Sequence, residues 1–254
     1  MRNFVVALFI ITLTICSFCF GKLPTGYVVL MGGSSVPPIV FEWMVEHKPE
    51  GKFLLISYSG SIGQRWQKLL DLNQEIEVIT PDQLNAKRIS GVGAILIDGG
   101  DQFKYISHLD SKVLQKAHEK GIMIFGTSAG AMILGEFYFT AKNGTITSPE
   151  AIADRKSICI EHNFMNILCL KGALVDSHYT EREREGRLKV FIDCVKNQGC
   201  KTGIGIDEST ALCIDPQGGM TVIGEGGVHM LTQDNSRTSL YPNDTSSYSH
   251  VCVR

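Results

Sequence analysis

The stretch Ile122–Met132 reads IMIFGTSAGAM, and it decides what kind of fold the chain can form. Its apolar start suits a buried strand, and the small residues after Phe125 allow a tight turn into a helix. The turn has the pattern G-x-S-x-G, which would push the Ser128 hydroxyl into a crevice beside the first N–H groups of the helix. The stretch therefore predicts a nucleophile at Ser128, and the alternative is an ordinary turn with a capping serine.

Similar apolar runs lie on both sides of this stretch and alternate with amphipathic segments. Strands are expected at Tyr27–Met31, Phe53–Ser57, Ile76–Ile79, Ala94–Ile97, Ala173–Val175, Gly203–Ile206, Thr210–Ile214, Met220–Ile223 and Val228–Leu231. Helices are expected at Pro37–His47, Ile62–Leu72, Phe103–Glu119, Ala129–Gly135 and Glu181–Asn197. This alternation predicts an α/β fold with a mostly parallel sheet covered by helices on both faces. No linker is visible, so residues 22–254 are expected to form one hydrolase-type catalytic domain, with a loose tail over 232–254.

The first 21 residues differ from the rest of the chain. Arg2 is their only charge, and an apolar run over Phe4–Ile15 is followed by small residues up to Gly21–Lys22. This layout is typical of a secretory signal peptide, and the run is shorter than the ~20 apolar residues of a membrane span. We expect export to the periplasm or medium, cleavage near Gly21–Lys22 and no membrane attachment after processing. Lipid modification of Cys16 or Cys19 is the alternative.

Composition excludes some partners and leaves others open. The formal net charge of the chain is −2, which gives no indication of a nucleic-acid partner. After processing the cysteines would be Cys159, Cys169, Cys194, Cys200, Cys213 and Cys252. In an exported chain they can form disulfides, and buried free thiols are an equal alternative. No His, Cys or Asp cluster has the spacing of metal ligands, so no metal or other cofactor is expected.

A serine nucleophile needs a base and an acid that orients the base. Ligands of parallel sheets bind beyond the carboxyl ends of the strands, so these partners should follow strands. His178 follows a predicted strand, whereas His47 and His118 fall in helices that end before strands, at the opposite edge. Glu208 follows another strand and is the candidate acid, with Asp207 as its competitor.

Four segments resemble those of the cyanophycinase-like serine peptidases, which are relatives of the aspartyl dipeptidases. They are IDGGDQ at 97–102, GTSAGA at 126–131, DSHYTEREREGRL at 176–188 and GIGIDESTA at 203–211. The resemblance spans about Gly26 to Leu231 and implies a fold similar to class I glutamine amidotransferases. The nucleophile of the glutamine amidotransferases themselves is a cysteine, whereas the candidate nucleophile of this chain is Ser128.

The resemblance also implies roles for individual residues. It implies a triad of Ser128, His178 and Glu208 that needs no metal. It implies an oxyanion hole made by backbone N–H groups of Gly99 or Gly100 and of Ala129. The residues associated with substrate binding or pocket shape are Gln102, Asp176, Arg182, Arg184 and Arg187.

The substrate that the resemblance implies is cyanophycin or another aspartyl peptide. Arginines suit this substrate because a guanidinium binds a carboxylate through two parallel hydrogen bonds. The alternative is that Arg182, Arg184 and Arg187 interleave with glutamates on a solvated helix. Ser177 stands where cyanophycinases usually have glutamine. This departure argues against cyanophycin as the substrate more than it argues against hydrolysis.

The sequence thus predicts a serine peptidase that cleaves aspartyl peptide bonds in a peptide or poly-aspartate substrate. One alternative is a dipeptidase that acts on an N-terminal aspartate. An alternative of another class is a non-catalytic binding protein on the same fold. The sequence allows a homodimer but does not require one.

Overall fold

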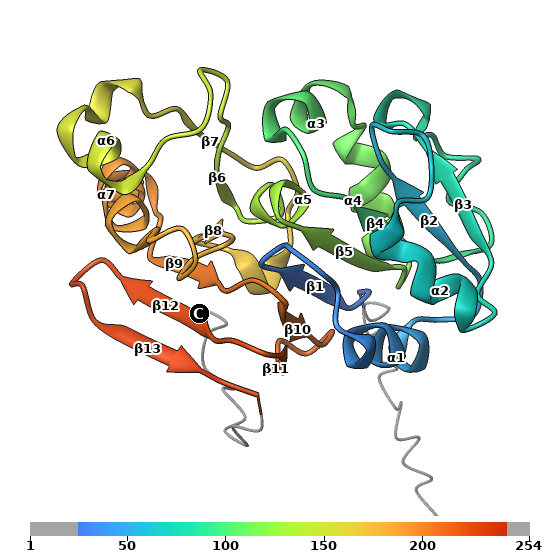
Figure 1. The fold of residues 1–254 in the computed structure, drawn as a ribbon. Helices are drawn as coiled ribbons and strands as arrows, with labels where there is room; N and C mark the ends of the chain where they lie inside the picture. The colour runs from blue at the N-terminus through green and yellow to red at the C-terminus, as the bar shows by residue number, and fades with distance from the viewer. Residues whose placement is uncertain (1–24, 243–254) are drawn as a thin grey trace, which may run out of the picture.

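The computed structural model of the chain describes residues 25–242, in which two β-sheets are covered by helices (Figure 1). The expected signal peptide and Cys252 lie outside these residues. Among the described helices, none combines the length and the apolar character needed to cross a bilayer.

The first sheet has seven strands in the order β11-β10-β1-β5-β4-β2-β3. Its strands are β1 (Val28–Met31), β2 (Lys52–Ile56), β3 (Ile76–Ile79), β4 (Val92–Ile97), β5 (Met123–Thr127), β10 (Thr210–Ile214) and β11 (Met220–Gly224). The strand pairs β1–β5, β5–β4, β4–β2 and β2–β3 are parallel. The pairs β1–β10 and β10–β11 are antiparallel. The parallel strands bring their carboxyl ends to one edge, and β5 delivers Ser128 there.

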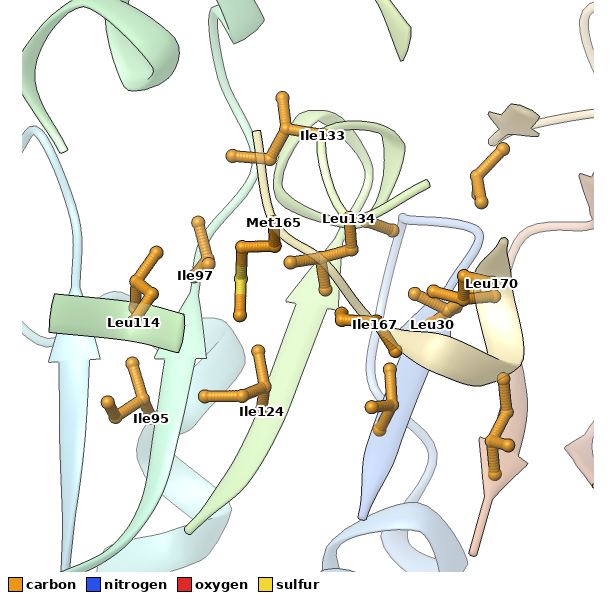
Figure 2. Close-up of a cluster of buried hydrophobic side chains, with 14 of the residues drawn as sticks. Leu30, Ile95, Ile97, Leu114, Ile124, Ile133, Leu134, Met165, Ile167 and Leu170 are labelled. Carbon is orange, nitrogen blue, oxygen red and sulfur yellow. The ribbon is translucent and has the colours of Figure 1, made fainter. Parts of the chain in front are cut away.

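Helices cover both faces of this sheet. They are α1 (Pro38–His47) and α2 (Gln67–Asp71) on one face, and α3 (Gln102–His108), α4 (Ser111–Glu119) and α5 (Ala129–Met132) on the other. Phe41 and Trp66 pack on the first face, whereas Leu114 and Ile133 pack on the second with Ile124 of β5 (Figure 2). Successive side chains of a strand point to opposite faces, which is why the central strands β1, β4 and β5 are almost wholly apolar.

The second sheet has six strands in the order β13-β12-β9-β8-β6-β7. Its strands are β6 (Phe137–Phe139), β7 (Ile160–His162), β8 (Ala173–Asp176), β9 (Thr202–Ile206), β12 (Val228–Thr232) and β13 (Arg237–Leu240), and its helices are α6 (Ser148–Ala153) and α7 (Glu185–Val195). Only the β6–β8 and β8–β9 pairings are parallel. The structure thus corrects the expectation of one mostly parallel sheet, because the short β10–β11 and β12–β13 connections can join only antiparallel strands.

Several other expected elements differ from the structure. The helix expected over Ile62–Leu72 is a 3-10 turn at Gln64–Trp66 followed by the short α2. The helix expected over Phe103–Glu119 is two helices, because the Asp110 carboxylate accepts hydrogen bonds from the N–H groups of Lys112 and Val113 and starts α4. Helix α7 begins only at Glu185. The segment expected to be loose from Thr232 contains β13, which pairs with β12. Short 3-10 turns lie at Gln64–Trp66, Pro81–Gln83, Arg155–Ser157, Leu168–Leu170 and Lys196–Gln198.

The described cysteines bear on the choice between disulfides and thiols. Cys159, Cys194, Cys200 and Cys213 are free thiols, so the thiol alternative holds for these four. Burial raises the pKa of Cys200 to about 12, and Cys213 is also buried with a raised pKa. These two thiols pack as small apolar side chains.

Candidate active site

Ser128 lies in a strained turn between β5 and α5. Its φ and ψ are 52° and −117°, a region that non-glycine residues rarely occupy. The turn is tight because a Cβ on Gly126 would lie 2.4 Å from the Gly130 carbonyl oxygen. The Ser128 N–H donates to the carbonyl of Met31 at 3.0 Å, which ties the turn to β1. The Ser128 side chain makes no hydrogen bond that caps α5, so it is not the capping serine of the alternative reading.

His178 follows β8 and reaches the serine from the second sheet. Its Nε2 lies 2.8 Å from Ser128 Oγ, which is a hydrogen-bond distance. The residue has a φ of 47°, and its N–H donates to the Gly32 carbonyl at 2.8 Å. Only 7% of the residue is exposed. The imidazole is therefore held where it can take the serine proton.

Glu208 lies in the turn that leads from β9 in the second sheet to β10 in the first. Its Oε1 is hydrogen-bonded to Nδ1 of His178. Asp207, the competing acid, points elsewhere and its Oδ2 lies 3.0 Å from Nε2 of His229. The structure thus brings Ser128, His178 and Glu208 into one hydrogen-bonded chain that spans the two sheets and the turn joining them.

The electrostatics of this chain suit a neutral base. Burial is the main effect on His178 and lowers its pKa from the ordinary 6.5, while Glu208 raises it and Arg182 and Arg184 lower it. The hydrogen bond with His178 lowers the pKa of Glu208. At neutral pH the imidazole is therefore uncharged, with Nδ1–H donated to an ionised Glu208 and Nε2 open to the serine hydroxyl.

A cleft of about 530 Å³ opens beside the serine. Gly99, Gly100, Arg65, Asp98 and Arg182 line it together with Ser128 and His178. Arg65 donates to the Asp98 carboxylate at 2.8 Å. Arg65 could not be predicted from the sequence, because a single arginine between two strands forms no pattern that distinguishes it.

Two of the predicted oxyanion donors, Gly99 and Gly100, line this cleft, and the third, Ala129, directly follows Ser128. Ala129 opens α5, so its N–H has no partner within the helix. A Cβ on Gly99 would lie 3.4 Å from Cβ of Ser128, and Gly100 lines the cleft. The Gly99 N–H donates to its neighbour Asp98 at 2.8 Å. The Gly99 N–H is thus already used within its own turn, whereas the Ala129 N–H has no partner within α5.

Most of the predicted substrate-binding residues lie away from the cleft. Asp176 is fully buried, and its carboxylate binds Arg187 through Nε at 2.8 Å and through Nη2. Arg184 donates to the Ser177 carbonyl at 2.7 Å and to Asp176 at 3.3 Å. This cluster ties the end of β8 to α7 rather than facing a ligand.

The other two predicted residues are placed differently from this cluster. Gln102 begins α3 and its amide donates to the carbonyl of Phe139 at 3.4 Å, outside the cleft lining. Arg182 is exposed and lines the cleft, since it belongs to the turn before α7 and not to the helix itself. Alternating glutamate and arginine look alike in sequence, and only the turn separates Arg182 from the buried pair.

Comparison with known proteins supports the resemblance seen in the sequence. The sequence model of peptidase family S51 matches residues 57–222. The cyanophycinase of Synechococcus elongatus is 31% identical over 173 residues, which cover 65% of this chain and 48% of the relative. The cyanophycinase of Trichormus variabilis is 27% identical over 172 residues, covering 66% of this chain and 53% of the relative. The chain spans about half the length of these curated relatives.

A solved structure shares the fold. A peptidase from an acI-B1 Actinobacterium superposes with a TM-score of 0.64 at 17% identity, covering 88% of this chain and 97% of the other. Fold and site together define an α/β protein built around a serine in a strained strand-to-helix turn. The chain belongs to peptidase family S51, and the family resemblance drawn from the sequence motifs is confirmed.

Proposed function

We propose that the chain is a serine peptidase that cleaves aspartyl peptide bonds with Ser128 as nucleophile, His178 as base and Glu208 as orienting acid. The observation that carries the proposal is the hydrogen-bonded chain from Ser128 through His178 to Glu208. A strained serine with its base at hydrogen-bond distance is the arrangement that nucleophilic catalysis requires.

The geometry supports a two-stage reaction. His178 Nε2 takes the proton of Ser128 as its oxygen attacks the substrate carbonyl, and the charge that develops on the carbonyl oxygen is stabilised by N–H groups of Ala129 and Gly100. Glu208 stabilises the imidazolium that forms. His178 then gives its proton to the leaving amine. Water attacks the resulting ester by the same steps in reverse and regenerates the serine.

The charges around the cleft support an acidic substrate. Arg182 is exposed at the cleft, and Arg65, which is paired with Asp98, adds a second guanidinium to its lining. A guanidinium is well suited to bind the carboxylate of an aspartyl residue. Asp98 also lines the cleft, where its carboxylate is paired with Arg65. Cyanophycin, a polymer of aspartate and arginine, carries such carboxyl groups and is the substrate we propose to test first.

Product analysis by mass spectrometry tests this function. The purified chain is incubated with cyanophycin, with peptides containing internal aspartate, and with dipeptides that begin with aspartate, and Ser128→Ala is the matched control. We expect cleavage beside aspartate by the wild-type chain and none by the variant. Cleavage of the dipeptides alone would favour the dipeptidase alternative. Binding of cyanophycin without cleavage of any substrate would favour the non-catalytic alternative.

A further inference from the structure

A second carboxylate–histidine pair lies directly beside the first in the sequence and in space. Asp207 precedes Glu208, and its Oδ2 lies 3.0 Å from Nε2 of His229 on β12. His229 is 2% exposed and Asp207 is 7% exposed. Neither residue lines the cleft, so this pair is not placed to contact a substrate. A buried ionisable pair that the reaction does not use needs another explanation.

The Asp207 carboxylate connects the backbone beside the base to the backbone beside the acid. Its Oδ1 accepts the N–H of Thr180 at 3.1 Å, and Thr180 is two residues beyond His178. Its Oδ2 accepts the N–H of Gly227 at 2.9 Å in addition to His229. Asp207 is also joined to Glu208 by the peptide bond. A shift of the Asp207 carboxylate would therefore move His178 and Glu208 relative to each other.

Packing holds His229 in one orientation. The ring of Tyr179 stacks on it with 5.0 Å between the ring centroids and 25° between the planes. Tyr179 is the residue after His178, and its N–H donates to the Ile206 carbonyl at 3.1 Å. A Cβ on Gly205 would come within 2.2 Å of the Tyr179 ring, so the two residues fit only because Gly205 has no side chain.

Hydrogen bonding also fixes the charge of Asp207 and the tautomer of the His229 ring. Burial acts to raise the pKa of Asp207, but hydrogen bonds from His229, Thr180 and Gly227 outweigh it and lower the pKa to about 2. On the other side of the His229 ring, Nδ1 lies 2.9 Å from both Ser239 Oγ and Nη2 of Arg237. Arg237 can only donate, so Nδ1 is an acceptor and the proton of neutral His229 is on Nε2, facing Asp207.

We propose that His229 is a positioning residue, which through Asp207 fixes the contact between His178 and Glu208. This inference rests on the proposed function, since the contact has a catalytic meaning only if Ser128 is the nucleophile. Outer hydrogen-bond partners of this kind orient the groups that react, and a displacement of about 1 Å at a reacting group can cost on the order of 100-fold in rate.

The charged groups around the two histidines determine what a substitution should change. Those facing His178 are Glu208, Arg182 and Arg184, and those facing His229 are Asp207 and Arg237, with Glu185 paired to Arg237. Loss of the His229 N–H leaves the buried Asp207 with one donor fewer. If the Glu208–His178 contact loosens, the pKa of His178 falls, because Glu208 is a group that raises it.

Three substitutions of His229 separate these effects. His229→Leu removes the N–H, His229→Gln keeps an amide N–H at the Nε2 end of the ring, and His229→Asn keeps an amide too short to reach Asp207. With an aspartyl peptide we expect His229→Leu and His229→Asn to lower kcat by roughly 10- to 100-fold, with little change in KM. In both variants the acidic limb of the pH profile, where kcat/KM rises with pH, should move to lower pH. His229→Gln should restore most of kcat and of the wild-type position of this limb. If the leucine variant does not fold, the two amides carry the test.

His118 provides a matched control, because it is also a buried histidine, at 3% exposure, but it lies at the end of α4 away from the cleft. His118→Leu should lower Tm without moving the acid limb. An NMR titration of the His178 ring, assigned by comparison with His178→Ala, needs no turnover and should show a lower pKa in His229→Asn. Unchanged kcat, acid limb and titration in that variant would overturn the inference. If the wild-type chain cleaves no aspartyl bond, the proposed function fails, while the titration still decides whether His229 positions His178.

Discussion

The backbone of Gly33 packs directly against the imidazole of His178. A Cβ placed on Gly33 would come within 2.3 Å of Cε1 and 2.5 Å of Nε2 in that ring. Real Cβ atoms do not approach other heavy atoms so closely, and Gly33 also has a φ of 107°. The turn after β1 is therefore the surface against which the candidate base rests.

Gly33→Ala should abolish or strongly reduce activity, because the added methyl group would push the ring away from Ser128. Kinetics with an aspartyl peptide and a thermal melt measure the effect. Gly199→Ala is the matched control, since Gly199 has a φ of 106° and open space around it. Both variants should lose about 1 kcal/mol of stability from backbone strain, but only Gly33→Ala should lose turnover. Equal activity in the two variants would show that the contact is unimportant.

Ser128→Ala should reduce hydrolysis by ~10⁴ to 10⁶ while the fold remains intact, because triad members act as a unit. The Ser128 side chain makes no capping hydrogen bond, so its removal should leave Tm nearly unchanged. Rates are compared with the wild-type chain, and circular dichroism checks the fold. Retention of activity in a well-folded variant would eliminate Ser128 as the nucleophile.

The rate of hydrolysis should depend on pH through His178. The base acts only when uncharged, and burial lowers its pKa below 6.5. Thus kcat/KM should rise with pH through a value below 6.5 and reach its plateau by neutral pH. Glu208→Gln should lower the rate less than Ser128→Ala and shift the acid limb to lower pH, because the glutamate raises the pKa of His178. An acid limb above 6.5 in the wild-type chain contradicts the assignment of a buried, neutral base.

Substitutions among the predicted substrate-binding residues should fall into two groups. Asp176→Leu leaves the buried Arg187 without its partner, and breaking such a pair typically costs ~3–5 kcal/mol of stability.

Arg182→Ala should instead raise KM for an aspartyl peptide and leave Tm within about a degree, since the side chain is exposed at the cleft. Thermal melting and kinetics on both variants decide. A normal KM in Arg182→Ala would remove this arginine from the substrate site.

We propose that the chain is exported and processed near Gly21–Lys22, on the basis of the charge-poor apolar start of the sequence. N-terminal sequencing of protein recovered from the cell envelope or the medium tests this. The expected result is a mature chain beginning near Lys22. An intact Met1 on protein from the cytoplasm would contradict it.

The sequence predicted those parts of the fold that depend on local patterns. The Ser128 turn could be predicted because only small residues permit it, and His178 and Glu208 because each follows an apolar run. The division into two sheets could not be predicted, because hydrophobic alternation does not say which strands pair. For the same reason the sequence left Asp207 and Glu208 as competitors, and only the path of the chain between the sheets directs one to His178 and the other to His229.

The roles of the arginines were hidden for a related reason. Arg182, Arg184 and Arg187 have identical chemistry, and their environments are set by where α7 begins. From the sequence, Gly32 and Gly33 indicate only a turn. The residues around His178 that pack against this turn lie about 145 positions further along the chain, so no local pattern connects the two segments.

The turn at Gly32–Gly33 and the Gly227–His229 segment lie on either side of residues 57–222, the part of the chain by which the family is recognised. That part contains Ser128, His178 and Glu208. The Gly33 backbone that supports the imidazole precedes it, and two of the three donors to Asp207, Gly227 and His229, follow it. The family match therefore includes the proposed reacting groups, whereas the residues that we propose to position them lie partly outside it. A relative could keep every reacting group and still be inactive if it had a bulky residue in place of Gly33.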